Sequence, residues 1–233
     1  MGYLISYQKG GRKEGLLLLN SFLNERGRDY SKEMSSPLTA YDSCSRLSAH
    51  IAFGTISMRE IVKKTDERKK EIKKLSKEDK GNWSRSISTF SSRLRWHCHF
   101  IQKLEDQPDI QYKNIHSLYN NLRDQKYNET FFELWKEGLT GYPMIDACMR
   151  SLIKTGWLNF RMRAMLMSFA SYHLWLPWQI TSKYLASLFT DYEPGIHYSQ
   201  CQMQSGTTGI NACLLYTSPS PRDATLSRMP SSA

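Results

Sequence analysis

Hydrophobic residues recur at intervals of three and four along most of this 233-residue chain. By this spacing Leu16, Leu19, Phe22 and Leu23 share one helical face, and Gly27 follows as a stop signal. No convincing run alternates polar and apolar residues with the period of two that marks a half-buried strand. The pattern therefore predicts an all-α protein.

Two capping boxes predict where further helices begin. Ser57 is followed by Glu60 and Thr130 by Glu133, the spacing at which two side chains satisfy free amide groups at a helix start. Apolar residues follow each box. We therefore expect one helix to begin near each of these two positions.

Longer apolar segments complete the helical pattern. Pro143 is a typical first helical residue, Gly156 is a typical stop, and Pro108 must end the helix before it. The predicted helices run from residue 83 to before 108, from 143 to 155, from about 159 to 175, and from about 178 to 189.

The composition fits one globular domain. A chain with 40% hydrophobic residues can bury one sizeable core. No apolar run approaches the roughly 18 residues that span a bilayer, so we expect a soluble, cytoplasmic protein. No C-x-x-C pair occurs, which argues against a disulfide framework or a zinc site and favours reduced thiols. The five cysteines are Cys44, Cys98, Cys148, Cys201 and Cys213.

The net charge of +10 indicates an anionic partner such as nucleic acid. Much of the charge lies between Lys63 and Lys80, where basic and acidic residues alternate. Such a run is typical of a solvated helix or loop, and we interpret it so. The charge alone therefore does not identify the partner.

The C-terminal segment after Asn211 has no helical period and is rich in serine and proline. The string CLLYTSPSPRD, residues 213–223, resembles the translation of a transposon-end sequencing adapter, and the final SRMPSSA resembles the far end of that adapter. We therefore interpret residues 213–233 as non-native, disordered read-through. Residues 1–14 are interpreted as the remnant of an interdomain linker, and residues 15–212 as a truncated helical domain.

General catalytic and nucleotide motifs are missing from the sequence. No G-x-G-x-x-G follows a strand, and no P-loop, nucleophile elbow or zincin motif occurs. His97 and His99 would point about 200° apart on a helix, which makes a shared metal ion improbable and predicts no metal site. Any chemistry must come from a cofactor or from binding.

The segment Ser45-Arg46-Leu47-Ser48 is the first candidate site. Hydroxyl groups, free amides at a helix start and one guanidinium can together hold a diphosphate. Alternatively, Ser45 is only a helix cap and Arg46 only a surface charge. Taken alone, the segment favours this second interpretation.

The second candidate is the segment TGYPMIDACMRSLIKTGWLNFRMR, residues 140–163. Its apolar positions alone predict two packed helices joined by a glycine turn. Asp146 and Arg150 are four residues apart, the spacing of an intrahelical pair. Arg161 and Arg163 are two apart, so only one of them can point squarely at a shared site.

The order of these two segments, and the identity and spacing of their residues, resemble the flavin-domain signature of photolyases and cryptochromes. The similarity continues through residues 91–104 and 191–211. It implies a compact multi-helix domain, incomplete at both ends, that holds FAD in a bent conformation. An antenna chromophore cannot be assigned from this chain.

The resemblance also implies roles for individual residues. The implied cofactor contacts are Tyr30, Ser45, Arg46, Leu47, Ser48, His97, Arg163, Asp191 and Glu193. The implied catalytic residues are Trp96, Arg163, Asp191 and His197, with His197 near flavin N5. The implied DNA or substrate contacts are Arg93, Trp96, Arg161 and Met203.

Several positions depart from the family's pattern. Arg93 stands where well-studied photolyases carry a glutamate, and Phe160 replaces an asparagine near the flavin. The usual W-Q-W beside the flavin is replaced by the segment YSQCQMQ, residues 198–204, so the first tryptophan of the photoreduction chain is missing. Trp178 aligns with its second member, although a lone tryptophan is more often core packing. Tyr198 and Trp175 are alternative substitutes.

The resemblance implies an FAD-dependent, blue-light-driven DNA photolyase that acts on damaged single- or double-stranded DNA as a monomer, with its flavin reduced in the active state. The alternative is a cryptochrome-like photoreceptor without repair activity. A third interpretation is a redox or structural flavoprotein with neither role.

Overall fold

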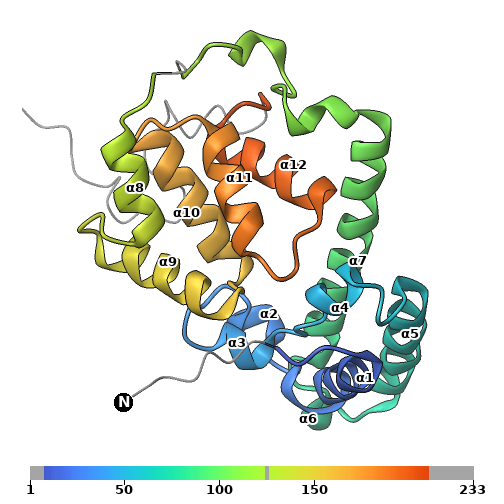
Figure 1. Ribbon diagram of the computed structural model, residues 1–233. Helices are drawn as coiled ribbons and strands as arrows, with labels where there is room; N and C mark the ends of the chain where they lie inside the picture. Colours follow the sequence, from blue (N-terminus) through green and yellow to red (C-terminus); the bar gives the residue numbers. More distant parts are fainter. Residues whose placement is uncertain (1–7, 124–125, 210–233) are drawn as a thin grey trace, which may run out of the picture.

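The computed structural model describes residues 8–123 and 126–209, and every regular element in these ranges is a helix (Figure 1). The predicted all-α class is confirmed. The helices are α1 (Arg12–Ser21), the π-helix η1 (Phe22–Arg26), α2 (Tyr30–Glu33), α3 (Ala40–Ser43), α4 (Ser48–Ala52), α5 (Met58–Lys74), α6 (Lys77–Lys80), α7 (Trp83–Asp106), the 3-10 helices η2 (Pro108–Gln111) and η3 (Ser117–Tyr119), α8 (Glu129–Glu137), α9 (Pro143–Thr155), α10 (Phe160–Tyr172), α11 (Trp178–Leu188) and α12 (Pro194–Ser205).

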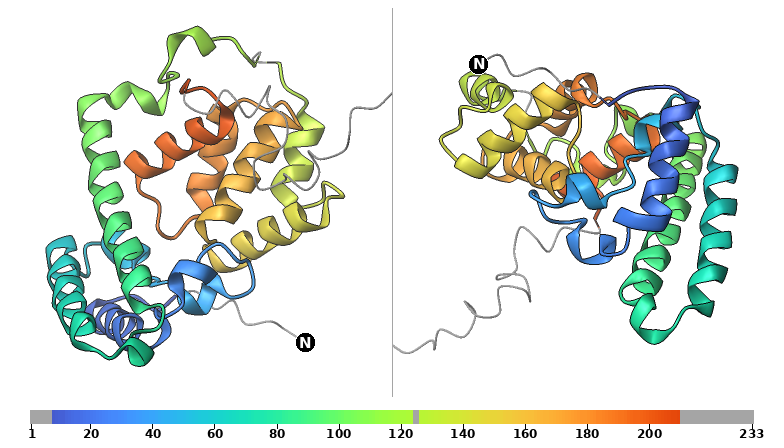
Figure 2. Two further views of the ribbon diagram at one scale, coloured as in Figure 1. Left: turned by 180° about the vertical axis from the view of Figure 1, so that it is seen from behind. Right: turned by 90° about the horizontal axis from the view of Figure 1, so that it is seen from below.

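Two hydrophobic clusters divide the molecule into two lobes (Figures 1 and 2). The N-terminal lobe packs α1, η1, α2, α5 and the first half of α7 around Phe22, Ile61 and Ile87. The C-terminal lobe packs α8 to α12 around Trp135 and Leu166. Each lobe packs its own hydrophobic core. The residues where the lobes meet are therefore not needed for either core and can line a binding site.

The two lobes meet along α7 and α12, which lie side by side in both views. Gly195 allows this contact, because a Cβ there would lie 2.7 Å from the backbone oxygen of Phe100. A second link is the Asn159 side chain, which donates to the backbone oxygens of Met34 and Ser36, both at 3.2 Å. These polar and close-packed contacts fix the spacing between the lobes.

The first predicted helix begins at Arg12 rather than at Gly15, so residues 12–14 belong to it. Gly27 is its stop as predicted, but the last turn is a π-helix in which the Gly27 amide donates to the Phe22 oxygen. The charged run from residue 63 to 80 forms the end of α5 and all of α6, as expected of a solvated helix.

One of the two capping boxes is correct and the other is wrong. The Ser57 hydroxyl accepts from the Glu60 amide at the start of α5. At α8 the cap is Asn128, whose side chain accepts from the Phe131 amide, and Thr130 lies inside the first turn. An asparagine caps a helix at least as well as a threonine, so α8 begins after Asn128, two residues before Thr130.

The later helices follow the predicted ranges closely. Pro143 begins α9, and Gly156 ends it with a φ of 67° that favours glycine. Helix α10 ends at Tyr172 rather than at Trp175, whose φ of 54° is incompatible with a continuing helix. Helix α12 was not predicted.

Two general properties complete the fold. No helix within the described ranges is long and apolar enough to cross a membrane. The four cysteines in these ranges are free thiols. The predicted read-through, residues 213–233, lies outside the described residues, as does Cys213.

Candidate functional site

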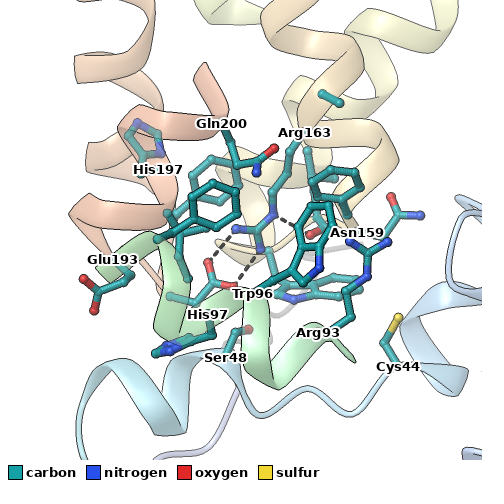
Figure 3. A pocket seen from close by; sticks show the side chains of 18 of the residues that line it. Cys44, Ser48, Arg93, Trp96, His97, Asn159, Arg163, Glu193, His197 and Gln200 are labelled. Atoms are coloured by element: carbon teal, nitrogen blue, oxygen red, sulfur yellow. Dashed lines mark hydrogen bonds and ion pairs between the residues drawn. The ribbon is translucent and has the colours of Figure 1, made fainter. Parts of the chain in front are cut away.

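A cavity of about 350 Å³ lies where the two lobes meet (Figure 3). One wall comes from α2, the 44–48 turn and α7, and the other comes from α10, α11 and α12. Most of the predicted site residues line it: Tyr30, Ser45, Leu47, Ser48, Arg93, Trp96, His97, Arg161, Arg163, Asp191, Glu193 and His197. The fold thus gathers residues that are far apart in the sequence.

Arg163 and Asp191 form the predicted ion pair in the C-terminal wall. The two Nη atoms of Arg163 donate to the two carboxylate oxygens at 2.9 and 2.7 Å. Its Nε donates to the Leu158 oxygen at 2.7 Å. A guanidinium has five N–H groups, so two remain that can face the cavity.

Asp191 is ionised despite its burial. Burial by itself raises the pKa of this carboxyl, but the charge of Arg163 and hydrogen bonds from Arg163 and Ser48 outweigh it and lower the pKa below its usual value. The side chain of Arg163 also packs over the Phe189 ring, 4.2 Å from its centroid. The pair is therefore a fixed dipole in the cavity wall.

His197, on the neighbouring helix α12, is neutral. Its Nε2 lies 2.8 Å from the Ser182 oxygen, which only accepts, so this nitrogen carries the proton. Burial is the main cause that lowers the pKa of this imidazole to about 4. The structure thus turns one ring nitrogen to α11, and the predicted position near flavin N5 stays a prediction.

Arg93 joins both walls at the rim. Its guanidinium lies 5.4 Å from the Trp96 ring centroid and 5.2 Å from that of Phe160, and it hydrogen-bonds the Tyr30 hydroxyl. Trp96 and Phe160 are 49% and 41% exposed, so both rings are accessible at the rim. This arginine–aromatic stack presents flat, cationic surface beside the exposed Arg161.

Arg46 and Met203 do not belong to the cavity lining of the described residues. Arg46 is buried, not a surface charge, and its guanidinium carbon lies 4.0 Å from the ring centroids of both Tyr41 and Trp157. Leu47, not Ser45, occupies the cap position of α4. A diphosphate contact through the Arg46 side chain therefore remains a prediction, whereas Ser45 and Ser48 do face the cavity.

The expected pair of Asp146 and Arg150 is not a hydrogen-bonded ion pair. Burial raises the pKa of the Asp146 carboxyl, but hydrogen bonds from Thr140 and Gly141, and after them the charge of Arg150, lower it below its usual value. Asp146 accepts from the amides of Thr140 and Gly141 and from the Thr140 hydroxyl. Arg150 donates to the Gly138 oxygen at 2.5 Å. The first residues of the 140–163 motif thus fold their own loop and do not reach the cavity.

Two residues that line the cavity carry unpartnered polar atoms. His97 Nδ1 and Gln200 Oε1 are buried without a hydrogen-bond partner among the described residues. Burial lowers the pKa of His97, and nearby Glu193 opposes the shift. Orphaned buried polar atoms are costly, so a ligand with both donors and acceptors fits the cavity. Gln200 was missed because no motif marks it.

A metal ion has no ligand set in this part of the chain. The described residues contain no group of three or more histidine, cysteine or acidic side chains that could hold one. His97 lines the cavity, whereas His99 packs beside Phe100 at 5.4 Å between ring centroids. The two histidines therefore have different surroundings.

Comparison with known proteins decides the family. Residues 90–225 match the family described as the FAD binding domain of DNA photolyase, and this range includes part of the predicted read-through. The chain belongs to the photolyase and cryptochrome family. Membership implies FAD as the cofactor, and the hydroxyls, ion pair and orphaned polar atoms of the cavity fit a group with a polar ring edge and a diphosphate.

Relatives include both photolyases and cryptochromes. The deoxyribodipyrimidine photo-lyase of Streptomyces griseus is 31% identical over 199 residues, which cover 85% of this chain and 40% of that protein. Cryptochrome-2 of Arabidopsis thaliana is 32% identical over 176 residues, or 75% of this chain and 28% of that protein. The chain thus spans less than half the length of either.

Solved structures agree on the fold. A bacterial class III photolyase from Agrobacterium tumefaciens superimposes with a TM-score of 0.75 at 26% identity, over 87% of this chain and 39% of that one. An archaeal photolyase from Sulfolobus tokodaii, solved with two FAD molecules, gives 0.68 at 32% identity, over 92% and 43%.

Tyr198 and Trp175, the two alternatives for the missing tryptophan, differ in their distance from the cavity rings and in their exposure. Tyr198 lies 6.4 Å from both Trp178 and Tyr192, measured between ring centroids, and Tyr192 lines the cavity. Trp175 is instead half exposed and packs on Arg123. Trp178 is buried in the C-terminal core, as expected of core packing.

Proposed function

We propose that the chain is the flavin-holding part of an FAD-dependent, blue-light-driven DNA photolyase, which repairs pyrimidine photolesions by electron transfer from reduced flavin. The observation that carries the proposal is the bidentate Arg163–Asp191 pair in the cavity wall. Bound flavin would supply the electron. The protein would supply the fixed charges and shape around it.

The ion pair supports this chemistry electrostatically. The two free N–H groups of Arg163 can donate to an electron-rich ring edge, and charge-assisted bonds of this kind favour the anionic form of a ligand. Asp191 fixes the guanidinium, so no side chain has to reorganise when charge develops. Neutral His197 adds no second positive charge.

The rim supports a role in binding damaged DNA. A base flipped from a duplex needs a flat surface to stack on and cations for the neighbouring phosphates. The flat surface is offered by Trp96, Phe160 and the Arg93 guanidinium. A cation for a neighbouring phosphate is offered by the exposed Arg161. DNA would thus approach the side of the cavity where the two lobes meet.

Repair itself is the test. The flavin-loaded, reduced protein is irradiated with blue light together with oligonucleotides that contain cyclobutane dimers or (6-4) photoproducts, and restored pyrimidines are measured by chromatography. Single- and double-stranded substrates are compared, with dark samples as controls. Light-dependent restoration is the expected result, and its absence for both lesions in both strand forms would contradict the photolyase proposal.

A cryptochrome-like photoreceptor is the second candidate. Arg93 favours it, because its guanidinium already stacks on Trp96 and Phe160 and bonds Tyr30 where a flipped base would enter. Under this alternative, light changes the flavin's absorption spectrum reversibly without restoring pyrimidines. The same irradiation experiment, followed by spectroscopy, separates the two candidates.

A further inference from the structure

We infer that Arg26 is a positioning residue for the cofactor, fixing the backbone of the 42–48 turn so that the cavity face of this turn can hold the FAD diphosphate. The inference rests on the proposed flavin function. Arg26 lies at the end of π-helix η1 and belongs to none of the motifs in the sequence.

Every N–H group of the Arg26 guanidinium has an acceptor. Nη1 donates to the backbone oxygens of Asp42 (2.9 Å) and Cys44, and Nη2 donates to those of Ser45 (2.8 Å) and Leu18 (3.2 Å). Nε donates to the Ser21 hydroxyl at 2.9 Å. One side chain therefore binds three carbonyls of a single turn and anchors them to the preceding helix.

These bonds orient the opposite side of the turn. In a trans peptide the N–H points away from the C=O, so the amides of Ser45 and Arg46 face away from Arg26. Cys44 and Ser45 line the cavity, whereas Arg26 is not among the described lining residues. The turn thus separates Arg26 from the cavity and directs its free amides away from the guanidinium.

The π-helix explains how Arg26 reaches the turn. Its wider turn bonds the Gly27 amide to the Phe22 oxygen, five residues back, and likewise places Arg26 Nε at Ser21. A Cβ on Gly27 would lie 2.3 Å from that Phe22 oxygen. Only glycine closes this turn without displacing the backbone. Single π-turns in helices are frequent at functional sites.

A second cation lies at the same turn. Burial is the main cause that lowers the pKa of Arg26, and the charge of nearby Arg46 lowers it further. Arg46 is held separately between Tyr41 and Trp157. One buried and one partly buried guanidinium group at a single turn create a positive potential, which favours an anionic ligand on its other face.

The test compares two flavins that differ in the diphosphate. Binding of FAD and of riboflavin to the 233-residue chain and to its Arg26→Met variant is measured in the dark by quenching of flavin fluorescence. We expect the variant to lose about tenfold or more in FAD affinity, since tenfold is about 1.4 kcal/mol. Riboflavin affinity should stay within about twofold, because riboflavin has no diphosphate.

Arg68→Met is the matched control. Arg68 also donates to a backbone oxygen, that of Leu23, and packs over Trp83 in the same lobe. Its loss should leave the ratio of the two affinities unchanged. Circular dichroism checks folding, and if Arg26→Met does not fold, Arg26→Lys decides, since lysine keeps the charge but lacks the forked donors.

The outcomes distinguish the two claims. An equal loss for both flavins, or unchanged FAD affinity, contradicts the role of Arg26. If the unchanged chain binds FAD but does not repair DNA, only the photolyase proposal fails. If it binds no FAD at all, both fail.

Discussion

The two walls of the cavity place their charges differently. In the C-terminal wall, Arg163 and Asp191 lie at the cavity surface and neutralise each other. In the N-terminal wall, Arg26 lies behind the 42–48 turn and the Arg46 guanidinium packs between Tyr41 and Trp157, so the turn lines the cavity with Cys44, Ser45, Leu47 and Ser48 and with no charged side chain. A paired charge suits a neutral or redox-active ring, whereas unpaired cations beside a polar turn suit an anion.

Asp191→Asn should have the largest effect on stability, because it removes the negative half of the paired charge in the C-terminal wall. It leaves the partly buried Arg163 without its carboxylate partner, and the cost should approach the roughly 3 kcal/mol at the low end for breaking a buried pair, because the Arg163 side chain is 28% exposed. Urea denaturation followed by circular dichroism should show this loss. Glu71→Gln, which removes an exposed partner of Arg68, is the control and should leave the midpoint unchanged. A midpoint shift no larger than that of the control would refute the structural role of the pair.

A pH series tests the neutral state of His197 in the same wall. Its pKa of about 4 in the folded protein lies below the ordinary value of 6.5, so the unfolded chain binds the extra proton first. Stability should therefore be complete above about pH 6.5 and should fall as the pH drops toward 4, by up to about 3 kcal/mol. His197→Asn should remove this part of the pH dependence. Asp191 stays ionised in this window because its pKa is lowered.

Gly195→Ala tests how the walls are spaced. The added Cβ would lie 2.7 Å from the Phe100 oxygen, so α12 must move away from α7. Overpacking of this kind costs about 2 kcal/mol. The same urea measurement should show it, together with weaker flavin binding. Gly10→Ala is the control, since nothing lies within 4 Å of a Cβ there.

The smallest expected effect concerns Arg46 in the N-terminal wall. A double-mutant cycle with Arg46→Met and Tyr41→Leu should give a coupling energy of about 1 kcal/mol, typical of a partly desolvated cation–π contact. Additive effects would show that the sandwich contributes no specific stability and that burial alone holds Arg46.

The sequence predicted those features of the fold that depend on residues close together in the chain, such as helix faces and helix ends. The periodic apolar faces, with Pro143 and Gly156, predicted most helix ranges closely. The residue pattern shared with photolyases and cryptochromes predicted most of the residues that line the cavity. The contacts of Arg26 with the 42–48 turn could not be predicted, because these three acceptors lie 16 to 19 residues away on an irregular segment. Likewise, Asp146 accepts hydrogen bonds from its own loop, and α12 has no periodic apolar face because most of its buried positions carry small or polar side chains.

The division into two separately packed cores has a consequence for folding. A ligand that touches both lobes binds only when both are folded and docked, so its binding free energy stabilises their association as well as each lobe. We expect amide hydrogen exchange without flavin to show two units that open independently, and exchange with flavin to show one. The cofactor would then add its own contacts to those that already join the lobes, among them the close approach at Gly195 and the hydrogen bonds of Asn159.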